Sequence, residues 1–184
     1  MLAILMILLS TASDETVAMQ YDDGTGVWIT TGYNSVWFHA GDFIEPISDF
    51  QIESTELWFI HSTSFPWDTS QFTMETWSST GSGGPETLLF QTPAVAESYV
   101  PVVIDYSQQC IKPGEDFVLA VNPEFSAGGW PSLLMDATPP PVPHSSGWAG
   151  WFTEGDLLVR CVVEINSEEI SPLSWAGIKT LFRR

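Results

Sequence analysis

The feature that most limits the fold of this chain is the spacing of its apolar residues, which alternate with polar ones. In ISDFQIES, Phe50 and Ile52 alternate with polar neighbours, as in a strand with one buried face. The segment DLLVRCVVEI repeats the pattern with Val159, Cys161 and Val163. Between about Met19 and Ile165 no stretch keeps the 3.6-residue period of a helix. The body of the chain is therefore predicted to consist of strands.

Turn-forming residues interrupt this alternation at short intervals. Gly, Pro, Asn, Asp and Ser gather in YDDGTG, GSGGPE, KPGED, NPEFSAGG and ATPPPVPHSSG. About ten short strands with such spacing are typical of two packed antiparallel sheets. We predict an all-β domain over residues 19–165, an antiparallel β-sandwich of jelly-roll-like type. Pro101 lacks an N–H for a sheet ladder, which predicts an edge strand or a bulge there.

The N-terminal end differs from this body. Residues 2–9 form the apolar run LAILMILL, which small polar residues follow. As a helix the run would cover roughly 12 Å, too short to cross about 30 Å of hydrocarbon. That length suits the apolar part of a signal peptide, so residues 1–12 are predicted to be signal-peptide-like and the protein to be exported. A buried N-terminal strand is the alternative.

The C-terminal residues 166–184 hold three of the five basic side chains, Lys179, Arg183 and Arg184. Apolar residues in SPLSWAGIKTLFRR recur at helical spacing, and the cations lie at the end that a helix dipole favours. This predicts a tail that is either a short amphipathic helix or a segment docked by Trp175.

Charge limits the partners of this protein. Five basic residues stand against 23 acidic ones, a formal net charge of −18. Phosphate backbones and anionic membranes would repel such a chain, so we predict no nucleic-acid binding. The glycine-rich GSGGPE lacks the Lys and the following helix of a phosphate loop. No zinc spacing and no G-x-S-x-G elbow occurs, so no catalytic residue is predicted.

Acidic residues in loops raise a metal hypothesis. Residues 20–164 carry 19 acidic and 2 basic side chains. Calcium takes six to eight oxygen ligands, and Asp22 and Asp23, with Asp156 or Glu154 near the last strand, are candidate ligands for a structural ion. The alternative is that Asp-Asp-Gly forms a turn on a solvated face.

The nine Trp residues suggest a ligand, because an indole ring stacks on the apolar face of a sugar. Trp67 in SFPWDTS and Trp130 in AGGWPS occupy loop-like segments and are the candidate ligand contacts. Rings packed over the end of the sandwich are the alternative. Four other Trp residues lie in strand segments and are predicted to lie in the core: Trp28, Trp37, Trp58 and Trp77.

The chain has two cysteines, Cys110 and Cys161. Two cysteines in an exported chain commonly pair. A disulfide between them would remove about 4 kcal/mol of unfolded-state entropy in the chain model. Two free thiols are the alternative.

Several segments between residues 20 and 164, taken in order, resemble an accessory β-sandwich module of secreted proteins from uncultured bacteria. They are YDDGTG, METW, GSGGPETLLFQT, KPGEDFVLAV and DLLVRCVVE. The W-x-x-I-K-x-L-F-R register at the end is similar to tails of other such exported proteins, with Ala176 where Gly is usual. The resemblance implies an extracellular, non-catalytic module, with a sorting or attachment role for the tail.

The sequence therefore predicts a secreted or cell-surface binding module without catalytic activity. Its predicted ligand is an extracellular polysaccharide, held by loop aromatics, or a cell-surface protein. The second hypothesis is a structural envelope or extracellular-matrix subunit that self-associates. The third is a hydrolase whose residues assemble only across the fold.

Overall fold

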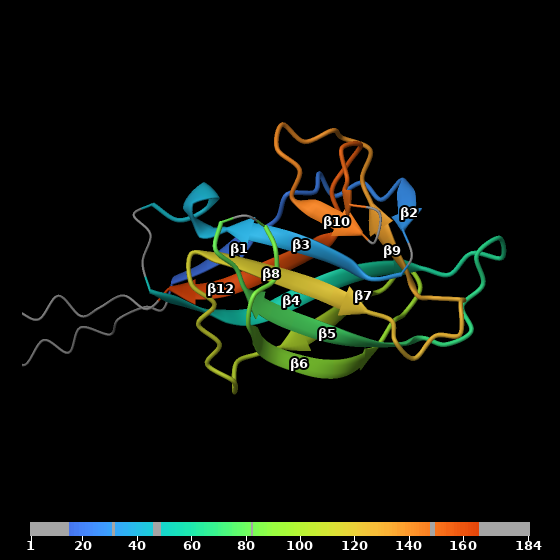
Figure 1. The fold of residues 1–184 in the computed structure, drawn as a ribbon, viewed down its shortest axis with the longest axis horizontal. Coiled ribbons are helices and arrows are strands. Elements are labelled where there is room, and N and C mark those ends of the chain that lie inside the picture. Colours follow the sequence, from blue (N-terminus) through green and yellow to red (C-terminus); the bar gives the residue numbers. More distant parts are fainter. Residues whose placement is uncertain (1–14, 31, 46–48, 82, 148–149, 166–184) are drawn as a thin grey trace, which may run out of the picture.

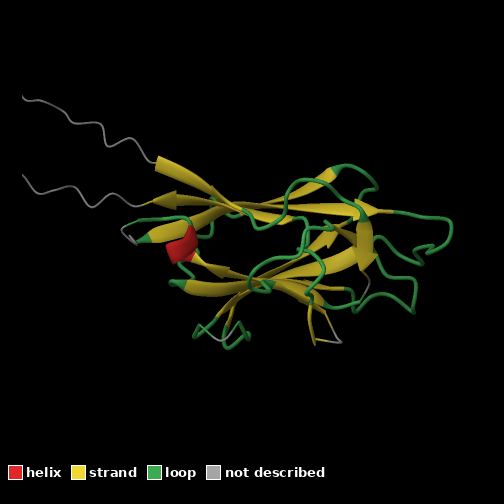
Figure 2. Cartoon of the chain, turned by 90° about the horizontal axis from the view of Figure 1, so that it is seen from above, coloured by secondary structure: helices red, strands yellow, loops and turns green. Residues whose placement is uncertain are grey.

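The computed structural model describes residues 15–30, 32–45, 49–81, 83–147 and 150–165. They form two six-stranded sheets packed face to face, and all pairs of named strands are antiparallel. Figure 2 shows the two layers, with loops at both ends. The predicted all-β sandwich is confirmed, with twelve strands in the described part of the chain rather than about ten.

The first sheet has the order β1-β12-β4-β9-β2, and β7 also pairs with β4. Its strands are β1 (Glu15–Met19), β2 (Trp28–Thr30), β4 (Phe50–Ile60), β7 (Pro101–Asp105), β9 (Ser132–Met135) and β12 (Val159–Ile165). Among the described strands β7 pairs with β4 alone. It is an edge strand, as Pro101 predicted, because proline cannot donate to a second neighbour.

The second sheet has the order β11-β10-β3-β8-β5-β6. Its strands are β3 (Asn34–His39), β5 (Gln71–Ser78), β6 (Leu88–Val95), β8 (Asp116–Asn122), β10 (Ser145–Gly147) and β11 (Gly150–Trp151). The chain changes sheet at most connections, as in a jelly roll (Figure 1). A short 3₁₀ helix, η1 (Ala40–Asp42), follows β3.

The core between the sheets follows the alternation seen in the sequence. In β3, Val36 and Phe38 are buried while Trp37 between them is half-buried. Phe38 stacks on Phe117 of β8 with ring centroids 5.3 Å apart. From the facing sheet, Phe59 packs on Phe72 at 5.0 Å. Burying each such ring contributes about 2–3 kcal/mol. The Phe59–Phe72 contact joins β4 to β5 and therefore holds the two sheets together.

The prediction that the strand Trp residues lie in the core is wrong. Trp28 is 54% exposed on β2, and the other three are half-buried at positions that alternate with core residues: Trp37, Trp58 and Trp77. An indole N–H needs an acceptor, and the outer faces supply carboxylates. Trp58 Nε1 donates to Glu56 at 2.7 Å, and Trp77 Nε1 donates to Glu75 at 2.9 Å.

In the structure Cys110 and Cys161 are free thiols, which is the alternative to the predicted disulfide. Cys161 is buried between the sheets on β12, and burial raises the pKa of its thiol. Cys110 is exposed in the turn after β7, where its φ is 50°. The two side chains thus lie at different depths, one in the core and one at the surface.

The predicted signal-like segment 1–12 and tail 166–184 lie outside the described residues. The described sandwich begins with β1 at Glu15, before the predicted domain start at residue 19, and ends with β12 at Ile165. In the part of the chain that the structure describes, no helix has the length and apolar character needed to cross a membrane.

Candidate functional site

Two loops at one end of the sandwich carry the Trp residues that the sequence singled out. The segment 61–70 connects β4 to β5 and contains Trp67. The segment 123–131 connects β8 to β9 and contains Trp130. Because these strands belong to different sheets, the loops meet across the end of the sandwich.

Asp68 joins the two loops. Its carboxylate accepts hydrogen bonds from Ser126 Oγ at 2.8 Å, Ala127 N–H at 2.7 Å and Gly129 N–H at 3.2 Å. Its own N–H donates to Gly129 O at 2.8 Å. The Gly129 N–H is the main cause of a pKa of Asp68 below its usual range, because these donors stabilise the ionised form.

Gly129 allows the close approach of these loops. A Cβ at this position would lie 2.6 Å from both the backbone N of Asp68 and the backbone O of Pro66. No side chain fits there, so backbone packs directly on backbone. The residue that follows, Trp130, therefore extends from a chain segment held by both hydrogen bonds and packing.

Trp130 is 38% exposed and lies between two hollows. One hollow, of about 420 Å³, is also lined by Ser64, Phe65, Pro66, Gly128 and Gly129. The other, of about 300 Å³, is also lined by Gly32, Tyr33, Asn122, Pro123, Glu124 and Ser126. Phe65 is 55% exposed. We call Trp130 and these two hollows the Trp130 surface; it combines ring faces with amide, hydroxyl and carboxylate groups.

Trp67 packs against the core and is not an exposed ring like Trp130. Its ring lies edge-on to Phe59 at 6.3 Å and stacks on His61 at 5.0 Å. It is partly buried against the core, and its Nε1 is buried without a hydrogen-bond partner among the described residues. Trp67 and Trp130 therefore come from neighbouring loops but do not form one exposed pair.

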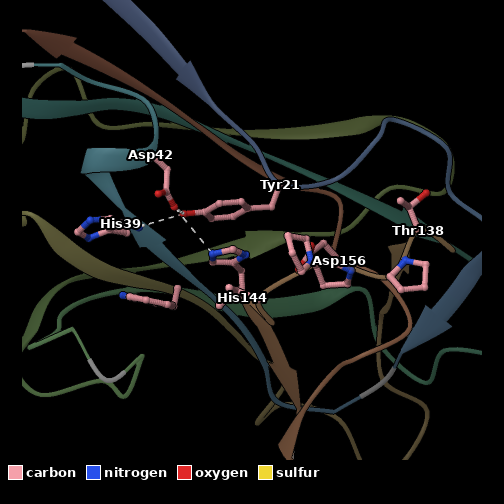
Figure 3. Close-up of a pocket in the computed structure, with 11 residues that line it drawn as sticks. Tyr21, His39, Asp42, Thr138, His144 and Asp156 are labelled. Atoms are coloured by element: carbon pink, nitrogen blue, oxygen red, sulfur yellow. Dashed lines mark hydrogen bonds and ion pairs between the residues drawn. The ribbon is translucent and has the colours of Figure 1, made fainter.

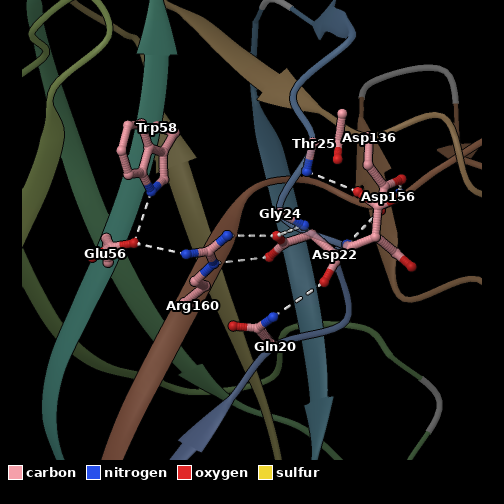
Figure 4. A network of polar contacts seen from close by, with 10 residues as sticks. Gln20, Asp22, Gly24, Thr25, Glu56, Trp58, Asp136, Asp156 and Arg160 are labelled. Atoms are coloured by element: carbon pink, nitrogen blue, oxygen red, sulfur yellow. Dashed lines mark hydrogen bonds and ion pairs between the residues drawn. The ribbon is translucent and has the colours of Figure 1, made fainter.

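One of the predicted calcium ligands, Asp22, pairs with an arginine (Figure 4). Asp22 has a fully buried side chain, and its Oδ1 accepts hydrogen bonds from Arg160 Nη2 at 2.8 Å and Gly24 N–H at 2.9 Å. Arg160 also pairs with Glu56 at 3.2 Å. The hydrogen bond to Asp22 raises the pKa of Arg160. A guanidinium thus neutralises the carboxylate that the sequence offered to a metal.

Asp136, which the sequence analysis did not single out, connects the other two candidates. Its Oδ2 accepts the Asp23 N–H at 2.9 Å, and its Oδ1 accepts the Asp156 N–H at 2.8 Å. Asp156 itself accepts from Ser145 Oγ at 2.8 Å, and burial raises its pKa. The sequence feature that could have indicated Asp136 is its position directly after the strand segment PSLLM.

The carboxylates of these aspartates thus serve as acceptors of hydrogen bonds from within the protein. Asp23 accepts hydrogen bonds from Thr138 Oγ1 at 2.6 Å and from the Thr25 N–H at 2.8 Å. Across the described ranges, no group of three or more His, Cys, Asp or Glu side chains is placed to hold a metal ion. Calcium binding stays a prediction.

No protein-family model and no curated protein matches the sequence. A solved structure with a similar fold is that of the clostridial cysteine protease Cwp84 after propeptide cleavage. The two share 7% identity with a TM-score of 0.57, over 82% of this chain and 40% of the protease chain. This chain therefore matches less than half the length of that protein, and the likeness supports the sandwich fold alone.

Proposed function

We propose that this protein is a secreted or cell-surface binding module without catalytic activity, and that it binds a polysaccharide on the Trp130 surface. The observation that carries the proposal is an exposed indole between two hollows, on a backbone that two loops hold in place.

Sugar recognition needs an apolar ring face together with polar groups at its rim. Trp130 and Phe65 supply exposed rings, and Glu124 and Asn122 supply polar groups in the adjoining hollow. Because Asp68 already fixes the loop, little conformational entropy is lost on binding. The net charge of −18 favours a neutral glycan over a sulfated or uronate polymer.

The test is a glycan array probed with the wild-type chain and with Trp130→Ala. We expect binding of a neutral polysaccharide that Trp130→Ala weakens at least tenfold. The matched control is Trp28→Ala, which removes another exposed indole on β2 and should bind as the wild type does. Equal binding by the Trp130 and Trp28 variants, or no bound glycan at all, contradicts the proposal.

Self-association is a second candidate function, favoured by the edge strand β7. Among the described strands β7 pairs on one side only; it carries the exposed Val103, and the exposed Tyr99 and Val100 precede it. Unpaired strand edges are templates for pairing with another chain. Sedimentation velocity tests this function: a wild-type oligomer that Val103→Lys converts to a monomer supports it, and a wild-type monomer at high concentration contradicts it.

A further inference from the structure

A separate hollow of about 530 Å³ shares no lining residue with the Trp130 surface; its lining is drawn in Figure 3. One wall is apolar and consists of Pro139, Pro140, Pro141 and Val142. The rest of the lining is mainly aromatic and polar: Tyr21, Trp37, His39, Asp42, His144 and Asp156. These residues come from segments far apart in the sequence, so tertiary structure assembles the hollow.

The part of the lining around Tyr21 is firmly held. The Tyr21 ring stacks on His144, with centroids 3.5 Å apart and an interplanar angle of 5°, and on Phe38 at 5.5 Å. Its hydroxyl donates to Asp42 Oδ2 at 2.7 Å and accepts the His39 N–H at 3.2 Å. The position of Asp42 is thus set by the hydroxyl of a half-buried, stacked phenol ring.

His144 does not neutralise Asp42. The residue is 8% exposed, and its Nδ1 is buried with no hydrogen-bond partner in the described part of the chain. Its Nε2 lies 3.9 Å from Asp42 Oδ2, too far for a hydrogen bond. Burial lowers the pKa of His144, so the ring is neutral near pH 7.

The hollow therefore holds negative charge without a cation. The Asp42 side chain is 46% exposed, and no Lys or Arg is among the residues of the lining. The described ranges contain two basic residues, and both are engaged elsewhere: Lys112 with Asp49, and Arg160 with Asp22 and Glu56. An anionic ligand would meet repulsion from the Asp42 carboxylate that no Lys or Arg of the lining offsets.

We propose that this hollow binds an alkylammonium group. Asp42 is its counterion, and Trp37 and the prolyl wall receive its apolar substituents. A cation is attracted both by a carboxylate and by the quadrupole of an indole, most strongly where water is excluded. Trp37 is preset for this role, because its Nε1 donates to Asp116 Oδ1 at 3.0 Å. The site is independent of the Trp130 surface.

Titration calorimetry with choline and with its uncharged isostere 3,3-dimethylbutan-1-ol tests the proposal. We expect choline to bind at least tenfold more tightly than the neutral alcohol, and Asp42→Asn to weaken choline binding at least tenfold. The matched control, Glu97→Gln, removes the same charge from an exposed site and should leave binding unchanged. Equal binding of both probes, or equal losses in both variants, overturns the proposal.

A measurement on the wild-type chain keeps the test valid if Asp42→Asn fails to fold. Choline should shift the indole N–H resonance of Trp37 and leave that of Trp130 unchanged; the reverse pattern overturns the proposal. Titration with n-butylammonium then distinguishes the two sources of the cation. Tighter binding of this primary amine assigns the hollow to a lysine-like group, and tighter binding of choline assigns it to a quaternary one. Trp130→Ala should not affect either probe, so this test and the glycan test fail separately.

Discussion

The Asp68 loops and the Asp22–Arg160 network both use aspartate as a hydrogen-bond acceptor, but in opposite settings. Asp68 is exposed among surface loops and accepts hydrogen bonds from neutral donors, Ser126 Oγ and two backbone N–H groups. Asp22 is buried and relies on the charge of Arg160. The comparison teaches that the exposed carboxylate organises a surface, whereas the buried one has to be neutralised for the domain to fold.

The largest effect on stability is expected at the buried Asp22–Arg160 pair. Arg160→Met leaves the Asp22 carboxylate buried and unpaired, so we expect the free energy of unfolding to fall by about 3 kcal/mol, measured by urea denaturation. The control is Lys112→Met, which breaks an exposed pair with Asp49 and should cost under about 1 kcal/mol. The double variant Asp22→Asn, Arg160→Met should recover part of the loss. Equal stability of the Arg160 and Lys112 variants would contradict this view.

Gly129→Ala sharpens the comparison at the loops. The added Cβ would meet backbone at 2.6 Å, so the loops must separate, at a cost of about 1–3 kcal/mol. We also expect glycan binding to be lost, because Trp130 follows directly. The control is Ala127→Gly, which keeps the backbone N–H that donates to Asp68. Unchanged stability and glycan affinity in the Ala variant would show that the close approach is dispensable.

The hydrogen bonds by which the Asp68 carboxylate joins the two loops should depend on pH. Its pKa is lowered in the folded state, so its stabilisation is complete above the unfolded pKa of about 3.9 and is lost as the pH falls through the folded value. We expect a change in the fluorescence of Trp130 below about pH 4, before global unfolding, and we expect Asp68→Asn to show the low-pH signal at neutral pH. A Trp130 fluorescence that stays constant down to pH 2 would contradict this role of Asp68.

The smallest expected effect is that of calcium. Three kinds of donor already bond these carboxylates: Arg160 donates to Asp22, a backbone N–H to Asp136, and the Ser145 hydroxyl to Asp156. Calcium would have to displace them. We expect millimolar calcium chloride to change Tm by less than about 2 °C in the wild type, measured by scanning calorimetry with a chelator as reference. A larger rise would support the structural ion predicted from the sequence.

The placement of individual residues shows how far sequence reasoning reached. Pro101 correctly indicated an edge strand, because a missing N–H is a local property. Trp37 was misplaced although the pattern held the answer, since Val36 and Phe38 on either side of it face the core. The contacts of Asp22 with Arg160 and of Asp23 with Asp136 could not be predicted, because pairings of distant strands bring these residues together.

The sequence by itself determined the strands, the turns between them and the excess of negative charge, because alternation, turn chemistry and composition act locally or add up over the chain. Tertiary structure alone decided which carboxylates are neutralised, which indole is exposed and where the hollows lie. Those properties depend on contacts between the two sheets and between loops that follow different strands. The alternation of apolar and polar residues along the chain does not specify which distant residues make these contacts.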